Sequence, residues 1–84
     1  MDQQYKDECL ERLDHLETML EQAHKEFIEN CDEYQSYLNK DEFNLRQIID
    51  KYKVIERYEN KIEIIKELIK RLREIVYPQI SSTN

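Results

Sequence analysis

The 84-residue chain contains no glycine, no tryptophan and a single proline, Pro78. Without glycine it cannot form a glycine-rich phosphate-binding loop. Because the only proline is Pro78, no proline interrupts a helix in the preceding residues. There is also no apolar run of about 18 residues, so the sequence predicts no membrane-spanning segment. Together these absences favour a helical chain.

Cysteine is also scarce, and the charge is mainly of one sign. Cys9 and Cys31 have no metal-binding spacing, and a helix would hold them roughly 33 Å apart, too far for a disulfide. We therefore expect free thiols in a reducing compartment, the cytoplasm or nucleus. The polar, acidic first residues do not resemble a signal peptide. The net charge of −6 argues against binding to nucleic acid.

The apolar residues that are present follow one seven-residue frame, lettered a to g, with Leu13 at position a. Apolar a and d positions place a stripe along one helix face, as in coiled coils. Apolar residues are 39% of the chain and charged residues 38%, which suffices for a stripe but not for a larger core. We predict that the following residues pack between helices: Leu13, Leu16, Leu20, Phe27, Ile48, Ile55, Ile62, Ile65, Ile69, Leu72 and Val76.

The frame weakens near its middle, where Asn30, Asp41, Asn44 and Lys51 occupy a or d positions. Asn39 is suited to the left-handed conformation that ends a helix. The next helix could be capped by Asn39 with Glu42, or by Asp41 with Asn44. The sequence therefore predicts a turn near residues 39–41.

This turn would separate two arms, of about residues 3–38 and 41–77, in a single domain of residues 1–78. The remaining residues, 79–84, follow Pro78 and show no heptad pattern, so we expect a flexible tail. The predicted fold class is all-α, an antiparallel helical hairpin of the coiled-coil type. The alternative is one long continuous helix that forms an antiparallel coiled-coil dimer.

Charge favours antiparallel pairing in either architecture. Residues 1–38 carry 11 acidic and 3 basic side chains, whereas residues 39–84 carry 8 and 10. Antiparallel pairing places the acidic arm on the basic arm, while parallel pairing would set two acidic arms side by side. With a turn near residue 39, we expect Glu17 to lie opposite Lys66.

The second arm also has apolar residues outside a and d, which one partner helix cannot cover. Several tyrosines cluster at the weak centre of the frame. They either pack at the turn end of the hairpin or form a patch that docks a partner, a role in which tyrosine is enriched. The candidate docking residues are Tyr34, Tyr37, Tyr52, Tyr58, Leu68 and Ile75.

Residues suited to chemistry are few. Glu21 and His24 have the Glu-x-x-His spacing of di-iron bundles, but a full site needs two such pairs, and both residues lie outside the seam. His24 on a helix face could accept a phosphoryl group, yet Lys25 follows it where such sites usually carry an acid. We expect no catalytic residue, no metal and no cofactor.

The predicted function is that of a non-enzymatic structural or adaptor subunit that binds other proteins by coiled-coil packing, as a homo-oligomer or within a larger complex. The alternative is a small regulatory protein that sequesters an enzyme or transcription factor through the apolar face of the second helix.

Overall fold

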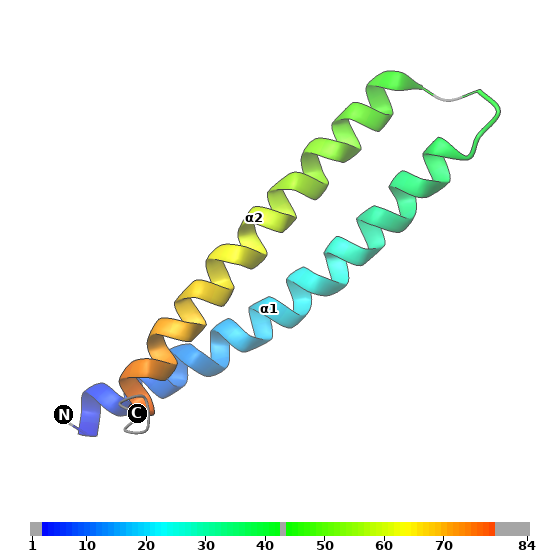
Figure 1. Ribbon diagram of the computed structural model, residues 1–84. Coiled ribbons are helices and arrows are strands. Elements are labelled where there is room, and N and C mark those ends of the chain that lie inside the picture. Colours follow the sequence, from blue (N-terminus) through cyan, green and yellow to red (C-terminus); the bar gives the residue numbers. More distant parts are fainter. Residues whose placement is uncertain (1–2, 43, 79–84) are drawn as a thin grey trace, which may run out of the picture.

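The computed structural model describes residues 3–42 and 44–78. It contains two helices, α1 (Gln3–Leu38) and α2 (Leu45–Val76), which lie side by side along their length (Figure 1). An ion pair between Glu17 and Arg73 near the chain ends, and another between Glu33 and Lys51 near the loop, show that the helices run antiparallel. The longest dimension is 60 Å. The predicted all-α hairpin is confirmed.

The alternative of one continuous helix is wrong, because α1 ends at Leu38. The amide of Asn39 still donates to the carbonyl of Gln35, at 3.1 Å. Asn39 does not take the left-handed conformation expected of it, since no residue of 3–42 and 44–78 has a positive φ.

The second helix begins later than residue 41, the predicted start. Asn44 is extended (φ −92°, ψ 109°), and its side-chain oxygen accepts a hydrogen bond from the Gln47 amide at 3.2 Å. This bond satisfies one of the free amides in the first turn of a helix, which is how an N-cap stabilises it. The helix therefore starts at Leu45 rather than at residue 41.

The end of α2 agrees with the position of Pro78. The last helical residue is Val76, and the Tyr77 amide donates to the carbonyl of Arg73 at 2.7 Å. A residue that precedes proline is disfavoured in the α conformation, and Tyr77 has left it (φ −124°, ψ 72°). The predicted tail, residues 79–84, lies outside the described part of the chain.

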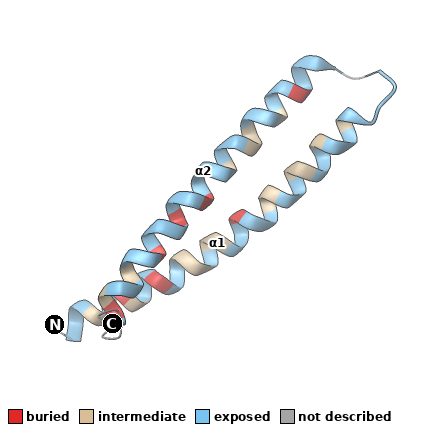
Figure 2. Cartoon of the chain, viewed as in Figure 1, coloured by how far each residue is buried: buried red, intermediate tan, exposed pale blue. Residues whose placement is uncertain are grey.

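The core is a single seam between the two helices, and Figure 2 shows the buried residues spaced along both of them. Its centre is one cluster formed by Leu13, Ala23, Ile62, Ile65 and Ile69. Ala23, at 2% exposed, is the most deeply buried of these five residues.

The structure places every predicted packing residue at least partly in the seam. Buried are Leu13, Ile48, Ile62, Ile65, Ile69 and Val76; half-buried are Leu16, Leu20, Phe27, Ile55 and Leu72. The buried residues Cys9 and Ala23 also belong to the seam, at d positions.

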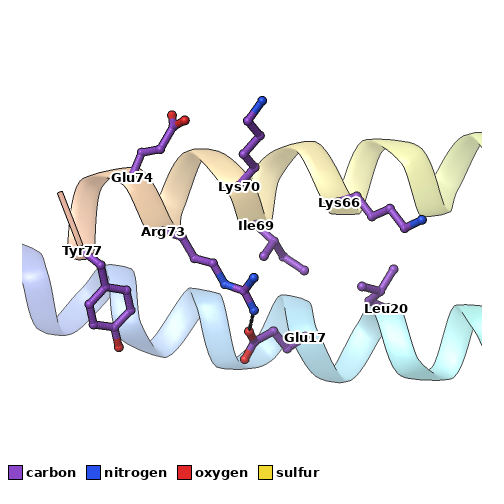
Figure 3. Close-up of a pocket in the computed structure, with 8 residues that line it drawn as sticks. All are labelled: Glu17, Leu20, Lys66, Ile69, Lys70, Arg73, Glu74 and Tyr77. Carbon is purple, nitrogen blue, oxygen red and sulfur yellow. Dashed lines mark hydrogen bonds and ion pairs between the residues drawn. The ribbon is translucent and has the colours of Figure 1, made fainter. Parts of the chain in front are cut away.

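The pairing register differs from the predicted one by a heptad. Glu17 bonds to Arg73, one heptad beyond the expected Lys66 (Figure 3). The loop runs to Asn44, so the midpoint of the hairpin lies further along the chain than residue 39. Because a and d positions must keep facing each other, the register can move only by a whole heptad.

Candidate helix-docking groove

The two long sides of the hairpin differ in chemistry. Along one side, which we name the paired side, a hollow near the chain ends is lined by Glu17, Leu20, Lys66, Ile69, Lys70, Arg73, Glu74 and Tyr77. In Figure 3 the side chains of Leu20 and Ile69 point toward each other between the helices, and Arg73 reaches across to Glu17. The charged residues here are three bases, Lys66, Lys70 and Arg73, and two acids, Glu17 and Glu74, so most of the positive charge is offset within the hairpin.

The other side carries a groove that we name the basic groove. Its apolar part lies over the middle of α2 and is lined by Leu16, Met19, Arg57, Asn60, Lys61, Ile64, Ile65 and Leu68. Ile64 is 61% exposed and Leu68 is 47% exposed, although both are large and aliphatic. Apolar side chains grouped in this way on a surface mark a site for another molecule better than single exposed residues do.

The basic groove continues toward the loop through two further hollows. The next is lined by Val54, Arg57, Tyr58 and Lys61, so it shares Arg57 and Lys61 with the apolar part. The last is lined by Tyr37, Asn44, Arg46, Gln47, Asp50, Lys51 and Val54, so it shares Val54 with the middle one. The shared residues make the three hollows one surface along α2.

Bases dominate the lining of this groove. Its charged residues are Arg46, Lys51, Arg57, Lys61 and one acid, Asp50. Lys51 is neutralised by Glu33, whereas Arg57 and Lys61 form no ion pair among the described residues. Arg57 and Lys61 are four residues apart, a spacing at which like charges on a helix repel.

A polar layer crosses the seam beside the loop end of the groove. Lys51 donates to the side-chain oxygen of Asn30 at 2.9 Å and to Glu33 at 2.6 Å, and Asn30 donates to the Glu26 carbonyl at 2.7 Å. Asn30 and Lys51 are both polar residues at d positions, and the Lys51 ammonium supplies the donor for the side-chain oxygen of Asn30. A polar pair in a seam specifies register at some cost in stability.

Glu26 and Tyr58 link the helices at the middle of the groove. The side chain of Gln22 donates to Glu26 at 2.8 Å, and this bond, followed by the Tyr58 hydroxyl, lowers the pKa of Glu26. The same contact with Glu26 raises the pKa of Tyr58 above its usual 10.0. The charge of Lys61 on α2 also lowers the pKa of Glu26. In turn, the Glu26 carboxylate on α1 offsets part of the positive charge of the groove.

The predicted docking residues do not form one patch. Tyr37 and Tyr58 line the basic groove, and the Tyr37 ring also lies 5.1 Å from the Lys40 ammonium and 5.9 Å from that of Lys51. Tyr34 is half-buried at an a position, while Tyr52 is 54% exposed and lies outside the groove lining.

The two aliphatic docking candidates, Leu68 and Ile75, also lie in different places. Leu68 lines the apolar part of the groove, whereas Ile75 is half-buried beyond it. Met19, Ile64 and Arg57 line the groove but were not among the predicted docking residues. They occupy g and c positions, so a search for apolar and basic residues at those positions would have found them.

Groups suited to chemistry are dispersed in the structure. Glu21 and His24 are both exposed, and no group of three or more His, Cys, Asp or Glu within the described residues could hold a metal ion. Cys9 is buried and Cys31 is half-buried, both as free thiols. Neither described helix is long and apolar enough to cross a bilayer.

No protein-family model, curated protein or solved structure matches this chain.

Proposed function

We propose that this chain is a non-enzymatic structural or adaptor subunit that joins other proteins by packing its helices against theirs. The observation that supports this most directly is the apolar part of the basic groove, where Ile64 and Leu68 remain exposed after the two helices have paired. A hairpin of two helices buries little surface, so covering these side chains with a further helix adds stability.

Pairing of the two helices leaves some large apolar side chains uncovered. The seam already uses the a and d positions of both helices, with Ile62, Ile65 and Ile69 buried. Ile64 and Leu68 contribute little to that seam. Their apolar surface stabilises a complex by roughly 25 cal/mol for each Å² removed from water, and it does so only when another molecule covers it.

The test compares two aspartate substitutions on exposed isoleucines. Ile64 is 61% exposed in the groove, and Ile28 is 57% exposed on α1, outside the groove lining. The tagged chain is expressed in its native cells and purified, and the molar ratio of any bound protein is measured by quantitative mass spectrometry. Ile64→Asp should remove a partner that is held at a fixed ratio, whereas Ile28→Asp should leave it bound.

Circular dichroism should show that both variants keep the helix content of the parent chain. Equal loss of the partner in both variants would contradict the proposal, because a general loss of stability would then explain it.

A second candidate function is that of a regulatory protein that sequesters an enzyme or transcription factor. It is favoured by the location of the exposed apolar groove residues, Ile64 and Leu68, which both belong to α2. The rate at which the bound partner protein exchanges distinguishes the two candidate functions. A structural subunit should retain its partner at constant ratio through dilution and isotope exchange, whereas a regulator should exchange it within minutes.

We also propose a reducing intracellular compartment, which is supported by the free thiols of Cys9 and Cys31. Labelling of Cys31 by a cell-permeable maleimide, before lysis, tests this point. A thiol already blocked by oxidation in the living cell would contradict it.

A further inference from the structure

The basic groove has a charge that its own hairpin neutralises only in part, because Glu26 is close enough to feel the charge of Lys61 but forms no ion pair with it. Arg57 and Lys61 line both the apolar part of the groove and the adjoining hollow. Neither is in an ion pair within residues 3–42 and 44–78. They stand one helical turn apart, so each raises the electrostatic energy of the other until an anionic group approaches.

On the paired side, by contrast, acidic residues accompany the bases. Lys66 and Lys70 also stand one turn apart on α2, but Glu17 and Glu74 line the same hollow. Two acids therefore offset most of the charge of the three bases in that hollow, and Arg73 is bonded directly to Glu17. An incoming acidic group therefore gains more at the basic groove than at the paired side.

The shape of the groove matches a helix. It follows α2 from Gln47 to Leu68, roughly 30 Å at 1.5 Å per residue. That length corresponds to a partner helix of about 20 residues, or three heptads. The groove has aliphatic residues at one end and mixed tyrosine and polar residues at the other, so the apolar stripe of the partner should be strongest opposite Ile64 and Leu68.

We infer that the basic groove receives one amphipathic helix of a different protein, with aliphatic residues along its inner stripe and glutamate or aspartate along its edges. This inference rests on the proposed function and adds the chemistry of the partner. The stripe covers Ile64 and Leu68, and the acidic edge faces Arg57 and Lys61. The product is a three-helix assembly in which the seam between α1 and α2 is kept.

A second copy of this chain does not satisfy the same requirements. Its α2 would bring Arg57 and Lys61 as well, so two grooves face to face would repel near their centre. Its α1 is acidic, but the apolar stripe of α1 is already used in its own seam. The large hydrophobic residues left exposed on α1, which are Tyr5, Ile28 and Leu38, are far apart in sequence and form no heptad stripe.

Two synthetic helical peptides of three heptads test the inference. Both have isoleucine at a and leucine at d; one has glutamate at e and g, and the other has lysine there. Binding to the full chain is measured by fluorescence anisotropy at physiological and high salt. We expect the glutamate peptide to bind about tenfold more tightly than the lysine peptide, with the difference shrinking at high salt, because two exposed ion pairs are exchanged for two repulsions.

Two matched double variants test which side of the hairpin causes the preference for the glutamate peptide. Arg57→Glu with Lys61→Glu should reverse the preference of the chain between the two peptides. Lys66→Glu with Lys70→Glu makes the same change in charge at the same spacing on the paired side, and it should leave the preference unchanged. Nuclear magnetic resonance should show shifts at Ile64 while the contacts between α1 and α2 persist.

Each other outcome overturns the inference. Equal binding of the two peptides would refute the acidic partner but leave helix docking in place, whereas no binding of either would count against the proposed function too. Displacement of α1 by the glutamate peptide would show exchange in the seam rather than docking in the groove. A dimer of the chain that is lost on Ile64→Asp would identify a second copy as the occupant. Preferential binding of phosphatidylserine vesicles through Arg57 and Lys61 would identify a lipid surface.

Discussion

Replacing Ile65 with alanine should destabilise the hairpin far more than the same change at the adjacent Ile64. Ile65 is 4% exposed and belongs to the central cluster, whereas Ile64 is 61% exposed in the basic groove. Both residues are isoleucines in α2, and they are adjacent in sequence. Any difference between their variants therefore reports burial rather than propensity.

The magnitudes follow from that difference in burial. Removing a buried isoleucine side chain costs about 2–5 kcal/mol, and the lower part of this range applies because a two-helix layer can relax around the cavity. At Ile64 the small loss of apolar contact is offset by alanine's better helix propensity, about 0.4 kcal/mol. We expect Ile65→Ala to lose about 2–3 kcal/mol and Ile64→Ala to lose at most about 0.5 kcal/mol.

Urea unfolding followed by circular dichroism at 222 nm measures both values. With a urea dependence of about 1 kcal/mol per molar for a chain of this size, Ile65→Ala should lower the midpoint by about 2–3 M. Each experiment is repeated at two protein concentrations. A midpoint difference between parent chain and Ile64→Ala that grows with concentration would mean that a second copy covers the groove.

Comparable losses at the two positions would refute the burial argument. So would a loss at Ile64 that exceeds the loss at Ile65, because the seam would then lie on a different face of α2.

Three further predictions concern the cap, the polar layer and Tyr58 at the middle of the groove. Asn44→Ala should cost about 1 kcal/mol in urea unfolding, because α2 loses its N-cap, and Asn44→Asp should restore most of it; equal midpoints for all three chains would contradict this. Replacing Asn30 and Lys51 together with leucine should raise the free energy of unfolding by about 1–4 kcal/mol but yield more than one species in sedimentation, since the polar pair no longer selects the register; a single monomeric species would count against that role. The contact with Glu26 raises the pKa of Tyr58, so its contribution to stability is complete below pH 10.0 and is lost as the pH rises through the folded-state pKa. Tyr58→Phe should remove this alkaline loss in urea unfolding between neutral and alkaline pH, and an unchanged profile would show that the contact with Glu26 does not stabilise the fold.

The helices themselves could be predicted because their signals are local. The heptad spacing of apolar residues indicates which face of each arm is buried, and Leu13, Ile62, Ile65 and Ile69 lie in the cluster where the frame places them. The polar centre of the frame indicates a break between the arms. Pro78 marks the end of α2 because of its effect on the preceding residue.

The predicted register, with Glu17 opposite Lys66, was wrong, because the register depends on the length of the loop. Asn39, Asp41 and Asn44 are all suited to ending or capping a helix, and local chemistry does not choose among them. Once Asn44 is the cap, the hairpin midpoint moves and the pairing changes by a heptad, from Lys66 to Arg73 opposite Glu17. The meeting of Asn30 with Lys51 follows from the same choice.

By itself, the sequence determined that this chain is helical, with two amphipathic arms of opposite charge bias, because period and composition are properties of each segment alone. The break between two separate helices was decided by the structure, in which α1 ends at Leu38 and α2 begins at Leu45. The tertiary structure decided which residues those helices leave uncovered. Met19 and Ile64 come from different helices, and they line one groove only after the loop length and the register are set. The charge left at Arg57 and Lys61 is likewise a result of packing. Among the described residues the structure pairs Glu33 with Lys51 and Glu17 with Arg73, whereas Glu26 offsets Lys61 only in part and without an ion pair.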